Sequence, residues 1–299
     1  MFFLFGLFVL SEIREQTLKL IYSKYSQDCI DNEKLHFSSK FFNDIVEEVF
    51  KNLVKDKQPS NKPTLIKLGG QSGTGKTTQL MPAIKSCLDE KNISYIHMAV
   101  RLFAVYHPDY NKLLKEYGQS LIREKTNGFA VLCLFAILEK LIKNRYNILY
   151  EITLLDPIFE EYTIKISKLN NYKIIYNVIS SPLEISNKWL NERTINSKIE
   201  PNRIVSEHSI SNLYNILPKA IEHIIKLSNC LGKNDYMILW NLIEKEPILV
   251  SNQFNQQILE LFNKNRIFDK KNISKLRTEK DALKDKISFY KKFFIDFNF

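Results

Sequence analysis

Short apolar runs alternate along this chain with longer amphipathic stretches. Residues 41–54 place apolar side chains at every fourth position in two adjacent rows, which is typical of a helix with one wide apolar face. Buried strands are predicted at five short apolar runs: residues 64–68, 94–100, 146–153, 172–180 and 236–240. Because helical stretches separate these runs, the sequence predicts an α/β fold with a parallel sheet covered by helices on both faces.

The stretches between the strands carry the helical pattern. Helices are predicted at residues 77–90, 111–125, 127–143, 158–169 and 208–227, with another that begins at Pro182. Beyond residue 249 the sequence predicts two extra C-terminal helices, and the last of them is apolar on one side and rich in lysine on the other. We therefore expect three parts: an N-terminal helical extension (1–40), a main domain (41–245) and a basic helical tail (246–299).

The first ten residues, MFFLFGLFVL, are apolar. A helix needs about 20 residues to span a bilayer, so this stretch is too short. It also lacks the basic start and the small-residue cleavage site of a signal peptide. A weak export signal, a membrane-surface anchor and a buried helix start all stay open, and we favour the buried helix start.

Composition and charge narrow the class of protein. Hydrophobic residues make up 44% and charged residues 25%, enough to bury a core. The net charge is +10, but residues 264–292 alone hold eleven Lys/Arg and four Asp/Glu. Since the basic excess lies mainly in the tail, we expect no nucleic-acid partner for the main domain. The four cysteines are far apart, which favours reduced thiols in a cytoplasmic protein. Because no segment approaches the length of a transmembrane span, we do not expect a membrane partner.

Half of the eight glycines of the chain lie within residues 69–75. They belong to the run Gly70-Gln71-Ser72-Gly73-Thr74-Gly75-Lys76-Thr77, which matches the P-loop pattern G-x-x-x-x-G-K-[ST] without a mismatch. A predicted strand precedes the run and a predicted helix follows it, as a P-loop requires. The motif therefore predicts a P-loop NTPase of the kinase-like class.

The chemistry of a P-loop assigns a role to each part of the run. Glycines let backbone N–H groups turn inward around phosphate oxygens, and the N-terminus of the next helix attracts the same anion. Lys76 can reach the β- and γ-phosphates, and the Thr77 hydroxyl is placed to ligate Mg²⁺. The predicted nucleotide-binding residues are Gly70, Gln71, Ser72, Gly73, Thr74, Gly75, Lys76, Thr77 and Thr78.

Residues 41–240 resemble the zeta-toxin family of P-loop kinases. The opening Gly69-Gly70-Gln71-Ser72-Gly73 is similar to the family's GGQ-[PS]-G start. The stretch that holds Phe103, His107, Pro108 and Tyr110 resembles the family's F-x-x-x-H-P-x-Y box. The strand at 146–153, YNILYEIT, resembles the family's YN-[IL]-[VIL]-x-E-G-T. These last two segments are much more specific than the P-loop alone.

The resemblance implies a function and further site residues. Zeta toxins phosphorylate a hydroxyl of UDP-N-acetylglucosamine with ATP, and a protein antitoxin blocks them. It therefore implies an ATP-dependent phosphotransferase with ATP (or GTP) and Mg²⁺, a sugar-nucleotide substrate and an antitoxin partner. The implied catalytic residues are Lys76, Arg193 and Arg203, and the implied substrate-binding residues are His107, Glu151 and Thr153.

One departure from the family pattern concerns the general base. Where the family has D-x-D before the His-Pro box, this chain has Ala99 and Arg101. A guanidinium cannot accept a proton at neutral pH. Three interpretations stay open: a weak or inactive enzyme, substitution by another carboxylate such as Asp109 or Glu151, or a changed substrate. The alternative function is therefore an inactive nucleotide-binding pseudokinase or interaction module.

Overall fold

A single sheet forms the centre of the computed structural model. Its strand order is β2-β3-β1-β4-β5-β6, and every neighbouring pair is parallel except β5 and β6. The strands are β1 (Thr64–Gly69), β2 (Ile96–Ala99), β3 (Ile148–Glu151), β4 (Lys173–Ile179), β5 (Tyr236–Trp240) and β6 (Leu249–Ser251). The five predicted strands are thus confirmed, and β1 is wholly buried in the middle of the sheet.

The structure describes residues 11–12, 14–16, 19, 39–153, 157–196, 207–241, 246–267 and 279–296. The predicted extension 1–40 lies almost entirely outside these ranges, so the three-part division stays a prediction. Within them, none of the helices combines the length and the apolar character that crossing a membrane requires.

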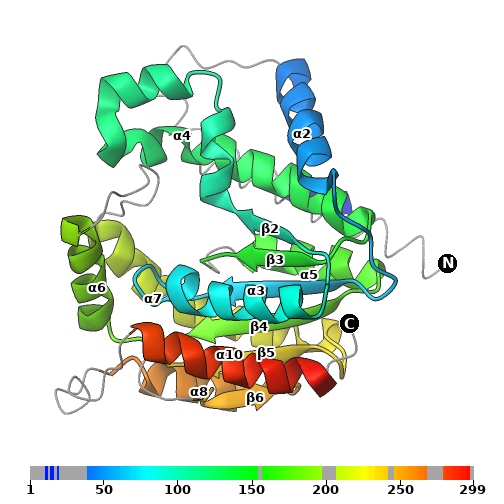
Figure 1. The fold of residues 1–299 in the computed structure, drawn as a ribbon, viewed down its shortest axis with the longest axis vertical. Helices are drawn as coiled ribbons and strands as arrows, with labels where there is room; N and C mark the ends of the chain where they lie inside the picture. Colours follow the sequence, from blue (N-terminus) through cyan, green and yellow to red (C-terminus); the bar gives the residue numbers. More distant parts are fainter. Residues whose placement is uncertain are drawn as a thin grey trace.

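Helices cover both faces of the sheet, as predicted (Figure 1). On one face lie α3 (Met81–Glu90) and α10 (Glu279–Asp296), packed on side chains of the central strands. On the other face, α4 and α5 pack over the β2–β3 side and α7 and α8 over the β4–β5 side. The bounds are α2 (Ser39–Val54), α4 (Tyr110–Lys143), α5 (Pro157–Leu169), α6 (Leu183–Asn196), α7 (Glu207–Lys226) and α8 (Gln256–Lys264).

The helix after the P-loop begins with a π-helical turn, η1 (Lys76–Leu80), before α3 continues it. Both Gln79 N–H and Leu80 N–H donate to the Gly75 carbonyl oxygen, at 2.8 and 3.2 Å. Pro82 follows within the first turn of α3, and proline has no N–H to donate to the carbonyl four residues earlier. The wider turn is the kind of irregularity that such an interruption produces.

The two helices predicted at 111–125 and 127–143 form one element, α4, and the predicted break between them is wrong. The helical geometry is interrupted instead at Gly118, with φ 70° and ψ 179°. Asn127 and Gly128 continue the helix. An isolated glycine is a weak signal for a break, because a helix interior tolerates it at a cost of about 1 kcal/mol.

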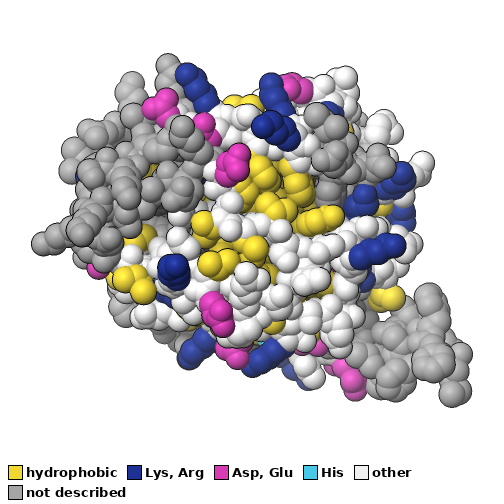
Figure 2. Space-filling model, turned by 90° about the horizontal axis from the view of Figure 1, so that it is seen from below, with side chains coloured by type: hydrophobic (Ala, Val, Ile, Leu, Met, Phe, Trp, Pro, Cys, Tyr) yellow, Lys and Arg dark blue, Asp and Glu magenta, His cyan; other side chains and the backbone are white. Residues whose placement is uncertain are grey.

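The C-terminal part contributes to the sheet and to the core. Residues 249–251 form the antiparallel edge strand β6, which the sequence pattern did not predict. Val250 on this strand is 41% exposed. Figure 2 shows the molecule from below the view of Figure 1, and apolar side chains gather on this face. The helix α10, which the sequence predicts in the tail, packs against α3 and η1, the helix that follows the P-loop.

The two tryptophans lie in different surroundings. Trp240, at the end of β5, is fully buried, and its indole N–H donates to the Tyr290 hydroxyl of α10 at 3.1 Å. The Tyr290 hydroxyl in turn donates to the Asn177 side chain of β4. Trp189 lies on α6 and is partly buried against the same apolar cluster. Trp240 is thus a core residue and Trp189 packs on the border of the core, as expected for large aromatic side chains.

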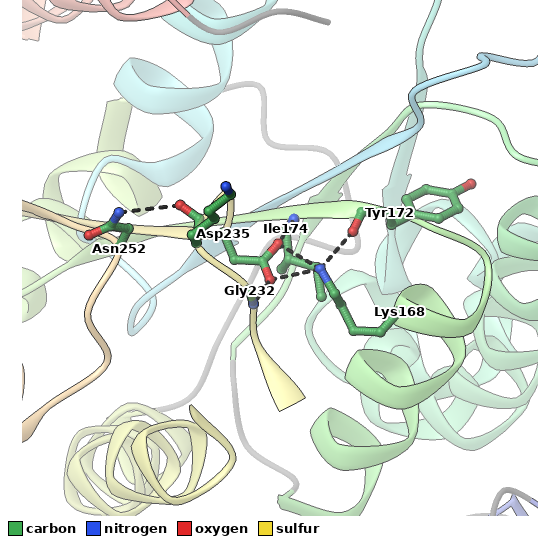
Figure 3. Close-up of polar contacts among 7 residues, drawn as sticks. Lys168, Tyr172, Ile174, Gly232, Asp235 and Asn252 are labelled. Carbon is green, nitrogen blue, oxygen red and sulfur yellow. Dashed lines mark hydrogen bonds and ion pairs between the residues drawn. The ribbon is translucent and has the colours of Figure 1, made fainter. Parts of the chain in front are cut away.

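Asp235 lies where β4 and β5 begin, at the opposite end of the strands from the P-loop. Its side chain contacts three segments of the chain (Figure 3). Its buried carboxylate accepts hydrogen bonds from Ile174 N–H at 2.7 Å and from Gly232 N–H at 2.6 Å. Lys168 Nζ of α5 forms an ion pair with it at 2.8 Å and also donates to the Tyr172 carbonyl oxygen. These contacts fix the start of β4 against the start of β5.

We expect Asp235→Ala to lower the free energy of unfolding by about 3 kcal/mol, because it leaves two backbone N–H groups and an ammonium without their acceptor. Urea unfolding of the full chain measures the change. Asp44→Ala, on the exposed side of α2, is the matched control and is expected to change stability by less than about 0.5 kcal/mol. Equal effects of the two substitutions would contradict the role given to Asp235.

Candidate functional site

The P-loop connects β1 to η1 and has the strand–loop–helix setting that the motif predicts. Its backbone is left-handed at Gly73 and Gly75, with φ 81° and 80°. A Cβ at Gly73 would lie 2.4 Å from the carbonyl oxygen of Ser186 and 2.9 Å from Leu190 on α6. Only glycine allows the loop to pass this close to α6.

Side chains of the loop hold its shape from inside. Lys76 Nζ donates to the carbonyl oxygens of Gly70 and Gln71, each at 2.6 Å, and the residue is only 7% exposed. The Gln71 amide donates to the Ser181 carbonyl oxygen at 3.1 Å and to the Ser186 hydroxyl at 2.8 Å. The loop is thus tied to the end of β4 and to α6, with its lysine turned into the ring of carbonyls.

Glu151, the last residue of β3, connects the P-loop to the neighbouring strand. The Thr77 hydroxyl donates to Glu151 Oε1 at 2.6 Å, and Arg101 Nη1 donates to Glu151 Oε2 at 2.6 Å. Parallel pairing of β3 with both β1 and β2 explains the meeting, because it brings the carboxyl ends of all three strands to one edge. Three predicted residues of interest are thereby brought together.

Glu151 is a carboxylate in this arrangement. Burial acts to raise its pKa, but the charge of Arg101 and the hydrogen bond from Thr77 outweigh burial, and the pKa of Glu151 lies below its ordinary value. A carboxylate held in this way is a weak proton acceptor. The structure thus disfavours Glu151 as the replacement for the missing general base.

Two further residues of this edge were not predicted from the sequence. Lys85 on α3 lies near Arg101 and Glu151; burial lowers the pKa of Lys85, Asp89 raises it and the charge of Arg101 lowers it. His97 on β2 has Nε2 3.9 Å from Glu151 Oε2, and burial, with the charge of Lys85, lowers its pKa to about 4. The alternation of a strand could have indicated His97, since it lies two residues before position 99 and so on the same face.

The position to which the family resemblance assigns a general base holds a cation, Arg101. Arg101 lies in a short 3-10 turn, η2 (Val100–Leu102), directly after β2. Its side chain is 17% exposed and turns toward Glu151. Asp109, the other candidate for a base, precedes α4, and its backbone N–H donates to His107 Nδ1 at 3.1 Å.

His107 is a core residue in this structure. It is 3% exposed, and its ring packs edge-on against Phe129 with the centroids 5.2 Å apart. Burial lowers the pKa of His107. This geometry favours a turn-closing role at the start of α4, and the substrate-binding role given to His107 stays a prediction.

We expect His107 to make stability dependent on pH. The unfolded chain protonates this residue near pH 6.5, about its ordinary pKa, whereas the folded chain keeps it neutral to a lower pH. Its contribution is complete above about pH 6.5 and is lost as the pH falls through the lowered pKa. The variant His107→Asn keeps an acceptor for the Asp109 N–H and does not titrate. Urea unfolding from about pH 7 to 5 should give a smaller loss for the variant, and parallel curves would contradict the assignment.

The remaining predicted site residues are placed less fully. Thr153 follows β3 at the same edge of the sheet and is half-buried. Arg193 lies on α6, but its side chain is outside the described part of the chain, and Arg203 is outside the described residues altogether. The structure therefore brings together Lys76, Thr77, Glu151 and Arg101, and leaves the two predicted lid arginines as predictions.

The donor atoms near the P-loop suit Mg²⁺ bound together with a nucleotide. The Thr77 hydroxyl and the Glu151 carboxylate are oxygen donors, which Mg²⁺ prefers, and it usually takes one or two protein oxygens together with phosphates and water. Across the described ranges, no group of three or more His, Cys, Asp and Glu side chains is placed to hold a metal ion. Thr77 is the first candidate ligand, and Glu151 positions its hydroxyl.

Comparisons with known proteins converge on one family. The family model described as Zeta toxin matches residues 50–232, more than half of the chain. Toxin PezT of Streptococcus pneumoniae is 35% identical over 136 residues, which cover 46% of this chain and 52% of that toxin. Toxin zeta of Streptococcus pyogenes is 29% identical over 39% of each chain. The matched region thus spans about half or less of these curated relatives.

Solved structures agree on the fold. A structure from the PezAT chromosomal toxin-antitoxin system of Streptococcus pneumoniae has a TM-score of 0.59 at 21% identity, and the match covers 84% of this chain and 98% of that one. The AvrRxo1-ORF1:-ORF2 structure with ATP has a TM-score of 0.53 at 14% identity, with 84% of each chain covered. At these identities the likeness concerns the fold alone.

Proposed function

This chain belongs to the zeta toxin family, and from that premise we propose that it is an ATP-dependent phosphotransferase. One observation carries the proposal: the P-loop threonine, Thr77, donates to a carboxylate, Glu151, at the end of the adjacent strand. Phosphoryl transfer depends mainly on positioning and on charge stabilisation, and a P-loop with its lysine supplies both.

The donor is proposed to be ATP bound on the P-loop. Lys76 is placed to leave the loop carbonyls and contact the β- and γ-phosphates, and the loop's backbone N–H groups cradle them. When bound, Mg²⁺ neutralises charge on the phosphates. Thr77 would hold that ion and Glu151 would orient Thr77. A structural neighbour that was solved with ATP supports this choice of nucleotide.

The acceptor is proposed to be a sugar nucleotide similar to UDP-N-acetylglucosamine, as the family resemblance implies. Glu151 and Thr153 lie at the carboxyl edge of the sheet, where ligands of open α/β folds bind. Arg193 and Arg203 are proposed to neutralise charge on the transferred group. An antitoxin protein is proposed as the partner, since a structural neighbour comes from a toxin-antitoxin system.

A pseudokinase is the second candidate, and Arg101 is the observation that favours it. The ion pair between Arg101 and Glu151 occupies the region in which the family's general base is expected. A protein of this kind binds ATP but transfers no phosphoryl group. Loose phosphoryl-transfer transition states need little help from a base, however, which keeps the phosphotransferase as the first choice.

The test is ADP formation by the purified full chain with MgATP and UDP-N-acetylglucosamine. We expect ADP together with an acceptor whose mass has increased by one phosphoryl group. The matched control is Lys76→Ala, which should form neither. ATP binding without ADP formation, with every acceptor offered, would favour the pseudokinase.

A further inference from the structure

The site is cationic at the end of β2, where the family resemblance places a general base. Arg101 and Lys85 lie near each other. Arg101 pairs with Glu151 at 2.6 Å, whereas Lys85 interacts first with Asp89 and less with Glu151. Glu151 also faces Lys76 of the P-loop, so three cations share it. Asp89 lies beyond Lys85 and is exposed. Positive charge therefore exceeds negative charge at this edge.

Arg101 keeps donors for another partner. A guanidinium carries five N–H donors in a planar fork, and a carboxylate with one oxygen already bound to Thr77 cannot accept them all. The same fork matches the oxygens of a phosphate group. Since the Arg101 side chain is 17% exposed, an incoming ligand can reach it.

A third polar group faces the same place. His97 Nε2 is buried, lies 3.9 Å from Glu151 Oε2 and has no hydrogen-bond partner. A buried polar atom without a partner costs about 1–3 kcal/mol, which a bound ligand can relieve. Arg101 and Thr77 bind the two oxygens of one carboxylate, so this place adjoins the proposed Mg²⁺-nucleotide site.

We propose that Arg101 and Lys85 form an anion subsite that binds a phosphate group of the acceptor. The inference rests on the proposed phosphotransferase function and names the residues that would recognise the phosphate or diphosphate of its acceptor. A neutral sugar does not satisfy this subsite. Arg101 thus determines which acceptors bind, in addition to replacing the aspartate of the family pattern.

The test separates this subsite from the P-loop, which also binds anions. The full chain is first saturated with Mg²⁺ and a non-hydrolysable ATP analogue, and a second ligand is then titrated by calorimetry and by thermal unfolding. The probes are UDP-N-acetylglucosamine, N-acetylglucosamine phosphate, neutral N-acetylglucosamine and inorganic phosphate. We expect the two phosphorylated sugars to bind and to raise the Tm, and the neutral sugar to do neither.

Variants at Arg101 give the decisive comparison. Arg101→Asp should weaken binding of the phosphorylated sugars at least about 10-fold, and Arg101→Lys should weaken it less. Lys112→Asp, an exposed site on α4 with the same change of charge, should leave it unchanged. Binding of the neutral sugar as tight as that of its phosphate overturns the proposal. Binding of inorganic phosphate together with no binding of either phosphorylated sugar also overturns it.

Turnover distinguishes failure of this inference from failure of the proposed function. If Arg101 only replaces a base, Arg101→Asp raises turnover and leaves acceptor affinity unchanged, which overturns the subsite and keeps the phosphotransferase. If no acceptor yields ADP but the second ligand still binds through Arg101, the subsite stands and the proposed activity falls. Should Arg101→Asp fail to fold, Arg101→Gln serves in the same measurements.

Discussion

Replacing Lys76 by Ala is expected to lower ATP-dependent turnover by at least about 100-fold, the cost of removing a charge-stabilising donor from a phosphoryl-transfer site. Lys76 is the first residue of η1, and its ammonium donates to the carbonyl oxygens of Gly70 and Gln71 in the loop. Its loss therefore removes contacts to the phosphates and leaves the sheet and its helices intact. Calorimetric titration with MgATP and an ADP-release assay measure the two effects.

The control for Lys76→Ala is Lys115→Ala, on an exposed position of α4. This variant also removes a lysine side chain, but at a position far from the P-loop in the sequence. It should bind and turn over ATP like the parent. Urea unfolding verifies that both variants fold. Unchanged ATP affinity in Lys76→Ala would contradict the assignment of the P-loop.

The second large effect is expected for Glu151→Gln. The change leaves Arg101 without its carboxylate, and we expect a loss of about 3 kcal/mol in the free energy of unfolding. It also weakens the acceptor that orients the Thr77 hydroxyl. Loss of a residue that orients a metal ligand typically lowers metal affinity or activity about 10- to 100-fold, so turnover should fall by that factor. Mg²⁺ dependence of the ADP-release assay measures it.

A double-mutant cycle isolates the Glu151–Arg101 pair. Arg101→Gln should destabilise the fold less than Glu151→Gln, because it leaves Glu151 with the Thr77 hydroxyl. The stability loss of the double variant should be smaller than the sum of the two single losses. Each single variant leaves the remaining partner unpaired, whereas the double variant removes both. Strict additivity would mean that the 2.6 Å ion pair contributes nothing to stability.

The sequence predicted the architecture and the centre of the site for physical reasons that can be named. Apolar runs of strand length, separated by amphipathic stretches, are sufficient to predict a covered parallel sheet. The P-loop motif, with Gly70, Gly75, Lys76 and Thr77 at their fixed spacing, identifies the phosphate-binding loop. The sequence also predicts Glu151 at the end of a parallel strand, and the structure confirms that Glu151 is the last residue of β3.

Other features depend on tertiary contacts that a linear pattern does not contain. The ion pair of Arg101 with Glu151 needs the register of β2 against β3, in which Ala99 lies opposite Glu151. The break of α4 at Gly118 shows no signal beyond one glycine. The strand β6 is three residues long, too short for alternation to be recognised. His107, predicted on the substrate side, is held in the core by Phe129.

The positions of the two tryptophans allow their intrinsic fluorescence to report on the P-loop. Trp240 is shielded from water and hydrogen-bonded, so its fluorescence should be blue-shifted and indifferent to soluble quenchers. Trp189 is partly buried on α6, between Ser186 and Leu190, the residues that crowd Gly73 of the P-loop. Because Gly73 lies against this helix, we expect movement of the loop to change the surroundings of Trp189. A change in emission on adding ATP would therefore arise from Trp189, and it would follow the loop in real time without a label.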